Sequence, residues 1–411
     1  MIYLVFLAAL LPFALILYGR LIAPLKLQRR WRFFWGSIIV TLTALVAYAL
    51  PLTLQMARHP AAFVGTIWED LLPWMYYGMT LLFVLIMLII IRDLVWLVAK
   101  VVRCVREYRQ NAALKKSGRT ELTPEEIEAG NVQMSRRTFL KKASTLAILG
   151  SAVVATPVSI YAAKHDRKIK EVEIKLESLP KELAGLRIVQ LSDIHVGNTF
   201  FKEDVAAIVA ETNALNPDLI AITGDMVDGM PSLIGDWLEP LRELKARHGV
   251  WFVTGNHDHM WDGRGWCDFI AGLGIHVLEN AHEIIEINGT KVAIAGVIDY
   301  RGDRKNRKWK TDPVKALSDI PKKLFKLMLV HQPASVDDSL ANGADLVLVG
   351  HTHGGQCWPI NYIVDAMMKY SRGLYYVDGK AVFVSCGAGY WGPPLRIGFP
   401  PEIDVITLKQ A

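Results

Sequence analysis

Short polar blocks rich in histidine and aspartate punctuate the second half of the chain, and nearly every block follows an apolar run of strand type. The carboxyl ends of neighbouring strands in an α/β sheet meet at one edge, where such sheets bind their ligands. Carboxylate oxygens and imidazole nitrogens brought together there can bind metal ions. The series therefore predicts an α/β domain with a metal site at its strand ends. In chain order the blocks are Asp193-Ile194-His195, Gly224-Asp225-Met226-Val227-Asp228, Gly255-Asn256-His257-Asp258, His331 and Gly350-His351-Thr352-His353.

The apolar runs themselves set the expected secondary structure. Short runs of aliphatic and β-branched residues predict strands, and apolar residues recurring every three or four positions predict helices. Alternation of the two is typical of an α/β domain, and the residues from Asp166 onward suffice for one large core. The predicted strands are 186–191, 218–223, 250–254, 275–278, 283–287, 291–296, 326–330 and 346–349, and the predicted helices are 202–215 and 237–247.

In two pairs of polar residues, the two members of the pair are separated by a single position. Asp193 and His195 form one pair, and His351 and His353 form the other. On an extended segment side chains two residues apart point the same way, so each pair is expected to face one metal cluster. Mixed carboxylate and imidazole ligands suit Mn, Fe or Zn better than Mg alone. The series contains no cysteine, and the four cysteines of the chain predict neither a disulfide framework nor a structural zinc site.

Taken together, the blocks resemble the calcineurin-like metallophosphoesterase family, whose D-x-H, GDxxD, GNHD, single H and GHTH motifs occur here in family order. The resemblance covers the chain from about Lys168 to the C-terminus. GHTHGGQ at 350–356 and GAGYWGPPLRIGFPPEI at 387–403 resemble the bacterial membrane-associated branch of the family. The resemblance implies a sandwich of two sheets between two helical layers, an αββα arrangement, and a metal-dependent phosphoric ester hydrolase.

The resemblance also implies a role for each residue of the series. Two metal ions about 3.5–4 Å apart would bridge and deprotonate a water and clamp the phosphate oxygens. His257 would act beside them as general acid or stabiliser of phosphate charge. Asp228 would orient a ligand or the substrate, and Asp258 and His259 are expected in supporting or surface positions. The implied metal ligands are Asp193, His195 and His353 for one ion, Asn256, His331 and His351 for the other, and Asp225 as the bridge.

Apolar residues, 52% of the chain, are concentrated in its first 165 residues. A helix needs about 20 apolar residues to cross a bilayer. The run nearest the N-terminus is close to the lower limit and lacks a basic start, so it is expected to be an anchor and not a cleaved signal. Three transmembrane helices are therefore predicted within residues 1–102, at Ile2–Tyr18, Phe34–Met56 and Leu71–Ile91.

Charge on the intervening segments predicts the orientation of these helices. Residues 19–32 carry five basic residues and no acidic one, and residues 100–142 carry eleven Lys or Arg against five Glu. Positive loops stay in the cytoplasm, so the N-terminus is predicted outside and 103–138 is predicted to be a basic cytoplasmic linker. The surplus in 100–142 equals the net charge of +6, which indicates a membrane loop and no nucleic-acid scaffold.

A fourth apolar run follows a basic motif. Ser135-Arg136-Arg137-Thr138-Phe139-Leu140-Lys141 matches the twin-arginine export signal, and Ala143–Ala163 is the apolar run behind it. No A-x-A cleavage site follows, so 139–165 is expected to remain as a fourth transmembrane anchor. The metallophosphoesterase domain, 166–411, would then lie on the extracytoplasmic face of a bacterial cytoplasmic membrane. The lipid bilayer and the twin-arginine export machinery are the expected partners.

The expected function is a membrane-anchored two-metal phosphoesterase acting on a phosphodiester, pyrophosphate or phospholipid-type substrate. Phe200, Phe201 and Trp358 directly follow ligand blocks and are expected to form an apolar rim for a lipid chain.

Two alternatives remain open at this point. The first is an activity like that of the UDP-2,3-diacylglucosamine hydrolases of lipid A synthesis, which the predicted topology disfavours because their nucleotide substrate is cytoplasmic. The second is a non-catalytic membrane sensor or scaffold, against which the complete set of ligands argues.

Overall fold

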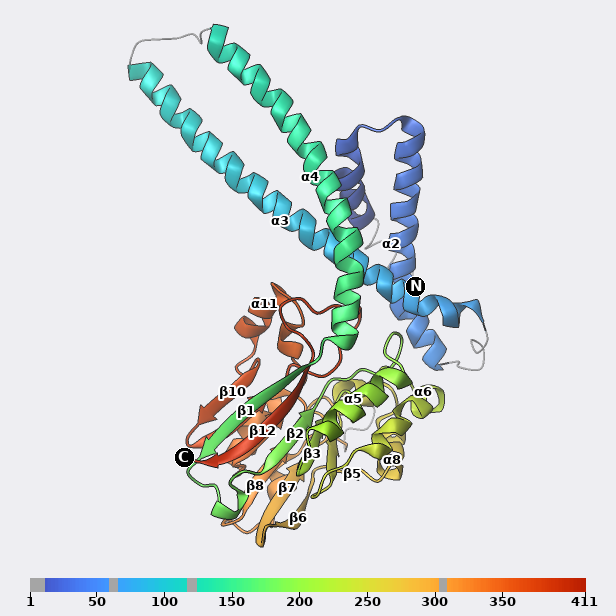
Figure 1. Cartoon of the computed structure of the whole chain (residues 1–411), viewed down its shortest axis with the longest axis vertical. Coiled ribbons are helices and arrows are strands. Elements are labelled where there is room, and N and C mark those ends of the chain that lie inside the picture. The colour runs from blue at the N-terminus through green and yellow to red at the C-terminus, as the bar shows by residue number, and fades with distance from the viewer. Residues whose placement is uncertain (1–11, 59–65, 117–123, 303–308) are drawn as a thin grey trace. The chain divides into compact units, whose positions relative to one another are not determined.

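The computed structural model describes residues 12–58, 66–116, 124–302 and 309–411 (Figure 1). The chain divides into two compact units. One, here called the helical unit, consists of Met1–Leu52 and Trp74–Val158, and the other, the sheet unit, consists of Thr53–Pro73 and Ser159–Ala411.

Three long helices carry the apolar sequence of the first 165 residues: α2 (Arg29–Arg58), α3 (Ile67–Lys116) and α4 (Pro124–His165). Each contains a stretch long and apolar enough to cross a bilayer. These stretches overlap the second, third and fourth predicted spans. They are Arg29–Thr53, Asp70–Arg109 and Thr138–His165.

The first predicted span, Ile2–Tyr18, lies largely outside the described residues. From Pro12 to Leu25 the described chain forms a shorter apolar helix. Its last turns are a π-helix over Tyr18–Ile22 and a 3-10 helix over Ala23–Leu25.

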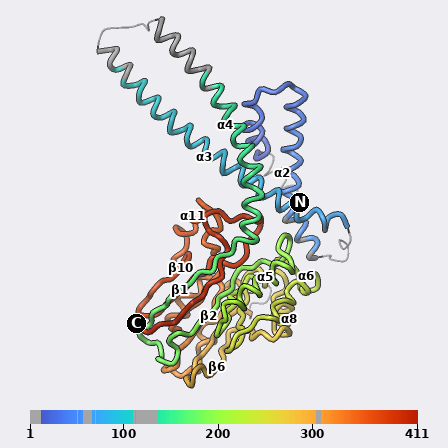
Figure 2. Tube along the Cα trace, viewed as in Figure 1, coloured from blue at the N-terminus to red at the C-terminus, as the bar shows by residue number. Residues whose placement is uncertain are grey.

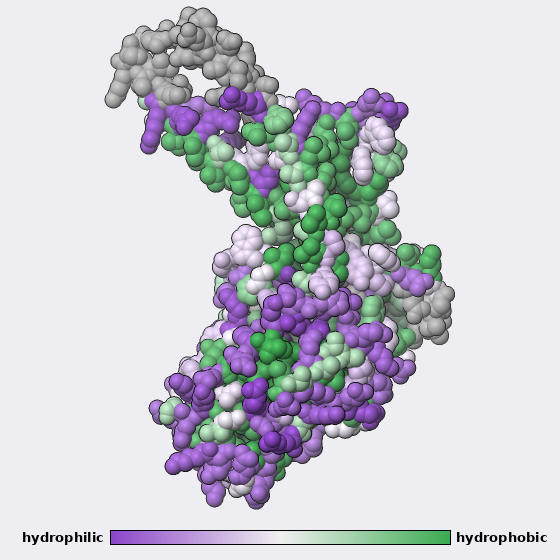
Figure 3. Space-filling view, viewed as in Figure 1, coloured by the Kyte–Doolittle hydropathy of each residue, from purple (hydrophilic) through white to green (hydrophobic). Residues whose placement is uncertain are grey.

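The basic segment 103–138 is helical wherever it is described, because α3 runs on to Lys116 and α4 begins at Pro124. Proline suits the first turn of a helix, where a backbone N–H would have no partner. In Figure 3 hydrophobic residues cover the middle of these long helices, and hydrophilic residues gather toward the charged ends of α3 and α4.

The sheet unit contains two six-stranded mixed sheets. The strands of the first are β1 (Lys168–Leu176), β12 (Glu402–Gln410), β2 (Arg187–Leu191), β3 (Leu219–Thr223), β4 (Val250–Val253) and β5 (His276–Val277), in spatial order. Those of the second are β10 (Gly373–Val377), β11 (Lys380–Val384), β9 (Leu346–Val349), β8 (Phe325–Leu329), β7 (Thr290–Gly296) and β6 (Ala281–Ile287), in spatial order.

Parallel pairing dominates the centre of both sheets. In the first sheet β2 to β5 are parallel, while β12 lies antiparallel to β2 and parallel to β1. Figure 2 shows β1, at the start of the sheet unit's main segment, beside the C-terminal strand. In the second sheet β7, β8, β9 and β11 are parallel, and β6 and β10 are antiparallel edge strands. The parallel strands therefore direct their carboxyl ends to common edges.

Helices cover the outer face of each sheet. They are α5 (Lys202–Ala214), α6 (Pro231–Leu238) and α8 (Gly263–Gly272) on the first sheet, and α9 (Pro313–Leu317) and α10 (Val336–Ala341) on the second. Two further helices, α7 (Asn256–Met260) and α11 (Ile360–Met367), lie in the segments that follow β4 and β9. One buried cluster, including Trp251 and Phe383, fills the space between the sheets. A second joins the first sheet to α5 and α8 through residues such as Ile208 and Trp266, and a third joins the second sheet to α10 through Leu340. Complete burial of such side chains stabilises the fold by roughly 1.5–3 kcal/mol each.

These layers confirm the predicted αββα sandwich. All eight predicted strands are present, with ends shifted by no more than two residues. The predicted helix at 237–247 is wrong. Helix α6 ends at Leu238 and a 3-10 helix follows over Glu239–Glu243, where Pro240 cannot donate the backbone hydrogen bond that an α-helix would need.

Candidate metal centre

The polar blocks of the sequence lie at the carboxyl ends of strands from both sheets. Asp193 follows β2 of the first sheet, and His351 follows β9 of the second. The backbone N–H of His351 donates to Asp193 Oδ2 at 2.9 Å. Behind them the Gln190 side chain donates to the Val349 carbonyl at 2.9 Å. These bonds fasten the two sheets together where their polar ends meet.

Left-handed backbone conformations aim the side chains at this junction. A non-glycine residue in this region costs roughly 1–2 kcal/mol and persists only where surrounding contacts determine its conformation. The extended geometry expected for the paired residues is therefore wrong, because tight turns and not continued strands direct them. The residues with positive φ are Asp193 (53°), His195 (54°), Asp225 (52°), His351 (74°) and His353 (50°).

Two glycines allow the blocks to approach one another closely. A Cβ atom on Gly255 would overlap the Asp225 carboxylate, and a Cβ atom on Gly350 would overlap the Ser192 hydroxyl. Both neighbours are buried and held by other contacts. A larger residue at either position would push the candidate ligands apart.

One group of candidate ligands contains Asp193, His195 and His353, whose ligand atoms lie within 4.8 Å of one another. His353 Nε2 is 3.4 Å from Asp193 Oδ1 and 3.1 Å from His195 Nε2. All three side chains are buried. The arrangement offers one carboxylate and two imidazoles to a single point.

A second group contains Asp225, His331 and His351 within the same limit. His331 Nε2 lies 3.1 Å from Asp225 Oδ2, and His195 Nε2 of the first group lies 3.8 Å from the same oxygen. Asp225 therefore stands between the two groups.

Electrostatics keep two of these histidines uncharged. Burial and the charge of His331 lower the pKa of His351 to about 3. Burial and the neighbouring Arg396 hold the pKa of His353 well below its usual value. Neutral imidazole is the form that binds metal, so both side chains are in the state a ligand requires.

His331 provides a test of whether a cation fits the site. Its Nδ1 lies 2.8 Å from the Thr223 carbonyl, to which it can donate, and this turns Nε2 toward Asp225. Nε2 is fully buried and has no hydrogen-bond partner of acceptable geometry among the described residues. Burial lowers the pKa of His331, but the Asp225 carboxylate raises it well above its usual value. A cation between these side chains would satisfy both atoms, so the residues fit a metal.

Asp228 connects two histidines. Its Oδ2 lies 3.2 Å from His195 Nδ1, and its Oδ1 lies 2.5 Å from His257 Nδ1. Burial would raise the pKa of Asp228, but the two histidines lower it. The carboxylate therefore fixes both rings by their Nδ1 atoms and leaves each Nε2 directed elsewhere.

His257 lies close to two of the candidate ligands. Its ligand atom is within 4.8 Å of those of His195 and Asp225, and its backbone N–H donates to Asp225 Oδ1 at 2.7 Å. Burial alone would lower the pKa of His257, but Asp228 and Asp225 raise it to about 9. Its ring also faces Trp391 at 6.0 Å between centroids. This position is compatible with either proton transfer or metal binding.

Asn256 is positioned through residues that the sequence did not single out. The Gln332 side chain donates to Asn256 Oδ1 at 3.1 Å and to Asp299 Oδ2 at 2.9 Å. Gln332 directly follows His331 in the sequence, and that adjacency was the only available signal. Asp299 lies three residues after the predicted strand 291–296, and this strand-end position was its only signal.

Asp258 is buried and not at the surface. Its carboxylate accepts from the backbone N–H groups of Gly255 at 2.7 Å, Met226 at 2.9 Å and Asp225 at 3.0 Å. It therefore holds two polar blocks together. Burial and the nearby Asp225 carboxylate raise its pKa to about 7. His259 packs beside it and shares a hydrogen bond with the Thr254 hydroxyl at 2.9 Å.

Arg396 is a further residue outside the predicted set. It is 5% exposed, and its guanidinium donates to the carbonyls of His353 at 3.1 Å and Cys386 at 2.8 Å. Nη2 also lies 3.0 Å from His353 Nδ1. It thus ties the GHTH block to the segment that precedes β12.

The predicted aromatic rim is only partly correct. Phe200 is fully buried and packs against Tyr390 in the core, so its assignment to the rim is wrong. Phe201 is partly buried. The Trp358 and Trp391 side chains are 44% and 57% exposed. The Trp391 ring lies beside the ring of His257.

Comparisons with known proteins agree with this geometry. A calcineurin-like phosphoesterase family model matches residues 186–355, and a Wntless-like transmembrane domain model matches residues 1–169. The first match contains every predicted ligand. The second contains the three long apolar helices.

Similar proteins occur in bacteria and in animals. A transmembrane protein with metallophosphoesterase domain from Danio rerio is 37% identical over 65% of this chain and 63% of its own length. A metallophosphoesterase of Helicobacter pylori is 36% identical over 67% of this chain and 71% of its own length. The metallophosphoesterase YkuE of Bacillus subtilis is 31% identical over 68% of this chain and 99% of its own length.

The match to some relatives is partial, since it spans 63% of the Danio rerio protein and 54% of a Caenorhabditis elegans metallophosphoesterase. The bacterial relatives are covered more fully, over 71% and 99% of their lengths. By these likenesses and the metal-binding geometry of its strand ends, the chain belongs to the calcineurin-like metallophosphoesterase family.

Proposed function

We propose that this protein hydrolyses a phosphoester at a two-metal centre. The observation that carries the proposal is the convergence of two histidine–aspartate groups on Asp225. Carboxylate and imidazole together suit Mn, Fe or Zn. Membership of the metallophosphoesterase family supports the same chemistry.

The proposed ligands fall into two sets. Asp193, His195 and His353 would hold one cation, and Asn256, His331 and His351 would hold the other. Asp225 would contact both. Asn256 Oδ1 accepts one bond from Gln332, and an amide oxygen has a second lone pair for a metal. Bound cations supply charge neutralisation for the phosphate and lower the pKa of a water molecule.

His257 is proposed to protonate the leaving oxygen of the substrate. Its Nδ1 is engaged by Asp228 at 2.5 Å, which leaves Nε2 for the substrate. A pKa near 9 keeps the ring protonated at neutral pH. Proton transfer by a positioned side chain accelerates a reaction by about 10²–10⁴-fold.

An apolar cavity favours a phospholipid-type substrate over pyrophosphate or a simple phosphodiester. The cavity has a volume of 370 Å³ and reaches Asp228. It lies entirely within the sheet unit, whose Thr53–Pro73 segment contributes part of the wall. Such a cavity accommodates a hydrocarbon chain beside a small number of polar groups. Its apolar lining includes Met56, Leu72, Phe201, Leu233, Ile234, Trp237 and Trp261.

The proposed location is the extracytoplasmic face of a bacterial cytoplasmic membrane, as a multi-pass protein. The segment Thr53–Pro73 joins the second and third spans and belongs to the same compact unit as Ser159–Ala411. This supports placement of the two on one side of the bilayer, opposite the basic segments.

We further propose that the Ser135–Lys141 motif engages the twin-arginine export machinery and remains as an anchor. Continuity of α4 to His165, three residues before β1 begins at Lys168, supports retention of the helix.

The rival function is a non-catalytic membrane sensor or scaffold. Retention of every predicted ligand supports the enzyme, since a protein that only senses would not need a complete metal set. A UDP-2,3-diacylglucosamine hydrolase activity would require the sheet unit in the cytoplasm. Reporter fusion after Ala411 separates these topologies, because activity of a periplasm-specific reporter is expected only for the proposed orientation.

The decisive experiment measures hydrolysis by the full chain in detergent micelles. With Mn we expect turnover of bis-p-nitrophenyl phosphate and of a short-chain phospholipid, and loss of both on chelation. Asp225→Asn should reduce turnover at least about a hundredfold, while Asp236→Asn, an exposed carboxylate on α6, should not. Equal turnover by the Asp225→Asn variant would exclude the proposed centre. Hydrolysis of pyrophosphate in preference to phospholipid would exclude the substrate class.

A further inference from the structure

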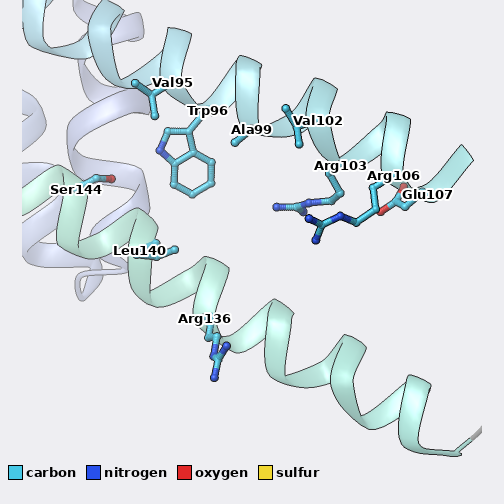
Figure 4. A pocket seen from close by; sticks show the side chains of 10 residues that line it. All are labelled: Val95, Trp96, Ala99, Val102, Arg103, Arg106, Glu107, Arg136, Leu140 and Ser144. Carbon is cyan, nitrogen blue, oxygen red and sulfur yellow. The ribbon is translucent and has the colours of Figure 1, made fainter. Parts of the chain in front are cut away.

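The helical unit contains a second cavity, of 650 Å³, between the facing sides of α3 and α4 (Figure 4). It shares no residue with the candidate metal centre. Its lining residues are Val95, Trp96, Ala99, Val102, Arg103, Arg106 and Glu107 from α3, and Arg136, Leu140 and Ser144 from α4.

The residues of each helix lie on one face. On α3 the lining residues recur at intervals of three or four, and on α4 Arg136, Leu140 and Ser144 are spaced four apart. Side chains at these spacings are neighbours along a helix surface. The cavity is therefore formed by two continuous helix faces and not by scattered side chains.

The cavity changes from apolar to basic along its length. Figure 4 shows Val95 and Trp96 at the end where α4 presents Ser144, and Arg103 and Arg106 at the end where α4 presents Arg136. The two helices thus contribute their arginines to the same end. An amphiphile with one anionic group and one hydrocarbon chain matches this gradient.

The basic end carries a surplus of positive charge. Three arginines face one acidic residue, Glu107. Within the described parts of the chain, no ion pair is formed by Arg103, Arg106 or Arg136. Their guanidinium groups are exposed and remain available to a phosphate, which guanidinium binds in bidentate fashion.

The apolar side chains that line the cavity lack a protein cover. Val95, Val102 and Leu140 are 62%, 57% and 55% exposed. All of the apolar lining residues lie within the candidate spans Asp70–Arg109 and Thr138–His165, whereas Arg136 lies two residues before the second of these. Arg103 and Arg106 lie within the last seven residues of the first span, and Arg136 lies just before the second. The three arginines therefore occur toward the ends of the spans, where basic residues would meet lipid headgroups.

We propose that this cavity binds one anionic phospholipid. The phosphate would pair with Arg103 and Arg106, with Arg136 adding positive charge at the same end, and an acyl chain would lie along Trp96, Val102 and Leu140. Basic pockets between membrane helices are suited to acidic headgroups, since attraction to the anionic lipid adds to burial of the chain. The bound lipid would join α3 to α4 where the helices separate. This site does not depend on the proposed phosphoesterase activity.

The test is native mass spectrometry of the full chain in mild detergent, titrated with phosphatidylglycerol or phosphatidylcholine. We expect one phosphatidylglycerol to be retained in preference to phosphatidylcholine. Arg103→Gln with Arg106→Gln should weaken this retention by about tenfold or more. The matched control, Lys100→Gln with Arg109→Gln, removes the same charge from α3 at exposed positions outside the cavity and should change retention by less than about twofold.

A second variant tests the apolar lining of the cavity without changing its charge. Val102→Trp should fill the cavity and weaken retention of the lipid although all arginines remain. If the double arginine variant is not monodisperse, this variant tests whether the lipid binds in the cavity. Equal losses in the arginine pair and its control, or equal retention of phosphatidylcholine, would overturn the proposal. Displacement of phosphatidylglycerol by millimolar inorganic phosphate would show a simple anion site in place of a lipid site.

Discussion

His257 Nδ1 lies 2.5 Å from Asp228 Oδ1, and this contact fixes the orientation of the histidine ring. The second oxygen of the same carboxylate holds His195, a candidate metal ligand. One aspartate thus couples the proposed acid to the proposed metal centre. Its two contacts explain why the GDxxD block needs a second carboxylate three positions after Asp225.

Replacement of Asp228 by Asn is expected to reduce kcat by about 10–100-fold. The amide cannot stabilise a protonated His257, so its pKa, raised to about 9 in the wild type, should fall. As pH rises, activity that needs the protonated His257 ring would then be lost at a lower pH than in the wild type. The measurement is the pH–rate profile of the full chain, whose alkaline limb should shift to lower pH. If the alkaline limb is unchanged while kcat is lower, Asp228 acts through its contact with His195 and not through His257.

Replacement of His257 by Ala distinguishes an acid from a ligand. As a proton donor, its loss should lower kcat by about 10²–10⁴-fold while the bound metal, measured by plasma emission spectrometry, stays near the wild-type amount. Because its ring also lies within ligand distance of His195 and Asp225, loss of metal would assign it to the metal set. His248→Ala, a partly buried histidine outside the cluster, is the control and should alter neither quantity.

Removal of metal is expected to destabilise the fold as well as abolish turnover. A cation that binds only the folded protein stabilises it by about 3 kcal/mol at a hundred times its Kd. Chelation should therefore lower the Tm of the full chain, and Mn should restore it. In Asp225→Asn the response to Mn should be much smaller, since the residue shared by both groups loses its charge. A wild-type Tm that does not respond to Mn would contradict binding at this cluster.

Titration of Asp404, on β12, is expected to lower the free energy of unfolding as pH rises. It is fully buried, and burial together with the Glu402 carboxylate raises its pKa well above the usual value. Between the unfolded and folded pKa values the folded state binds more protons, so the stability present at acidic pH is lost as pH rises through the folded pKa.

Asp404→Asn removes the cost of ionising this buried carboxyl group in the folded state. It should therefore raise the Tm at pH 8 by roughly 2–4 °C, with a much smaller gain at pH 4.5. Asp236→Asn provides the control for loss of a carboxylate at an exposed site. A gain that is equal at both pH values would show that titration of Asp404 is not its cause.

Strands that could be predicted share a simple local pattern. β3 and β9 are continuous apolar runs buried on both faces, and such runs indicate central strands whatever surrounds them. β1, β10, β11 and β12 escaped prediction. In β1 and β10 the outward residues are charged or aromatic and interrupt the apolar pattern, whereas β11 was missed although four of its residues are buried. β1 pairs with β12, which lies at the opposite end of the sheet unit's sequence. A local pattern contains no information about so distant a partner.

The sequence by itself determined the types of ligand, their order and the apolar spans, because these depend on side-chain chemistry and local periodicity. The family resemblance implied how the ligands combine, and only the tertiary structure supplies the physical reason for that combination. His351 joins Asp225 while His353, two residues later, joins Asp193. The left-handed backbone at both histidines causes this separation, and it is maintained by contacts between two sheets. The burial of Asp258 and the role of Gln332 arise in the same way, since each depends on backbone groups that only folding brings together.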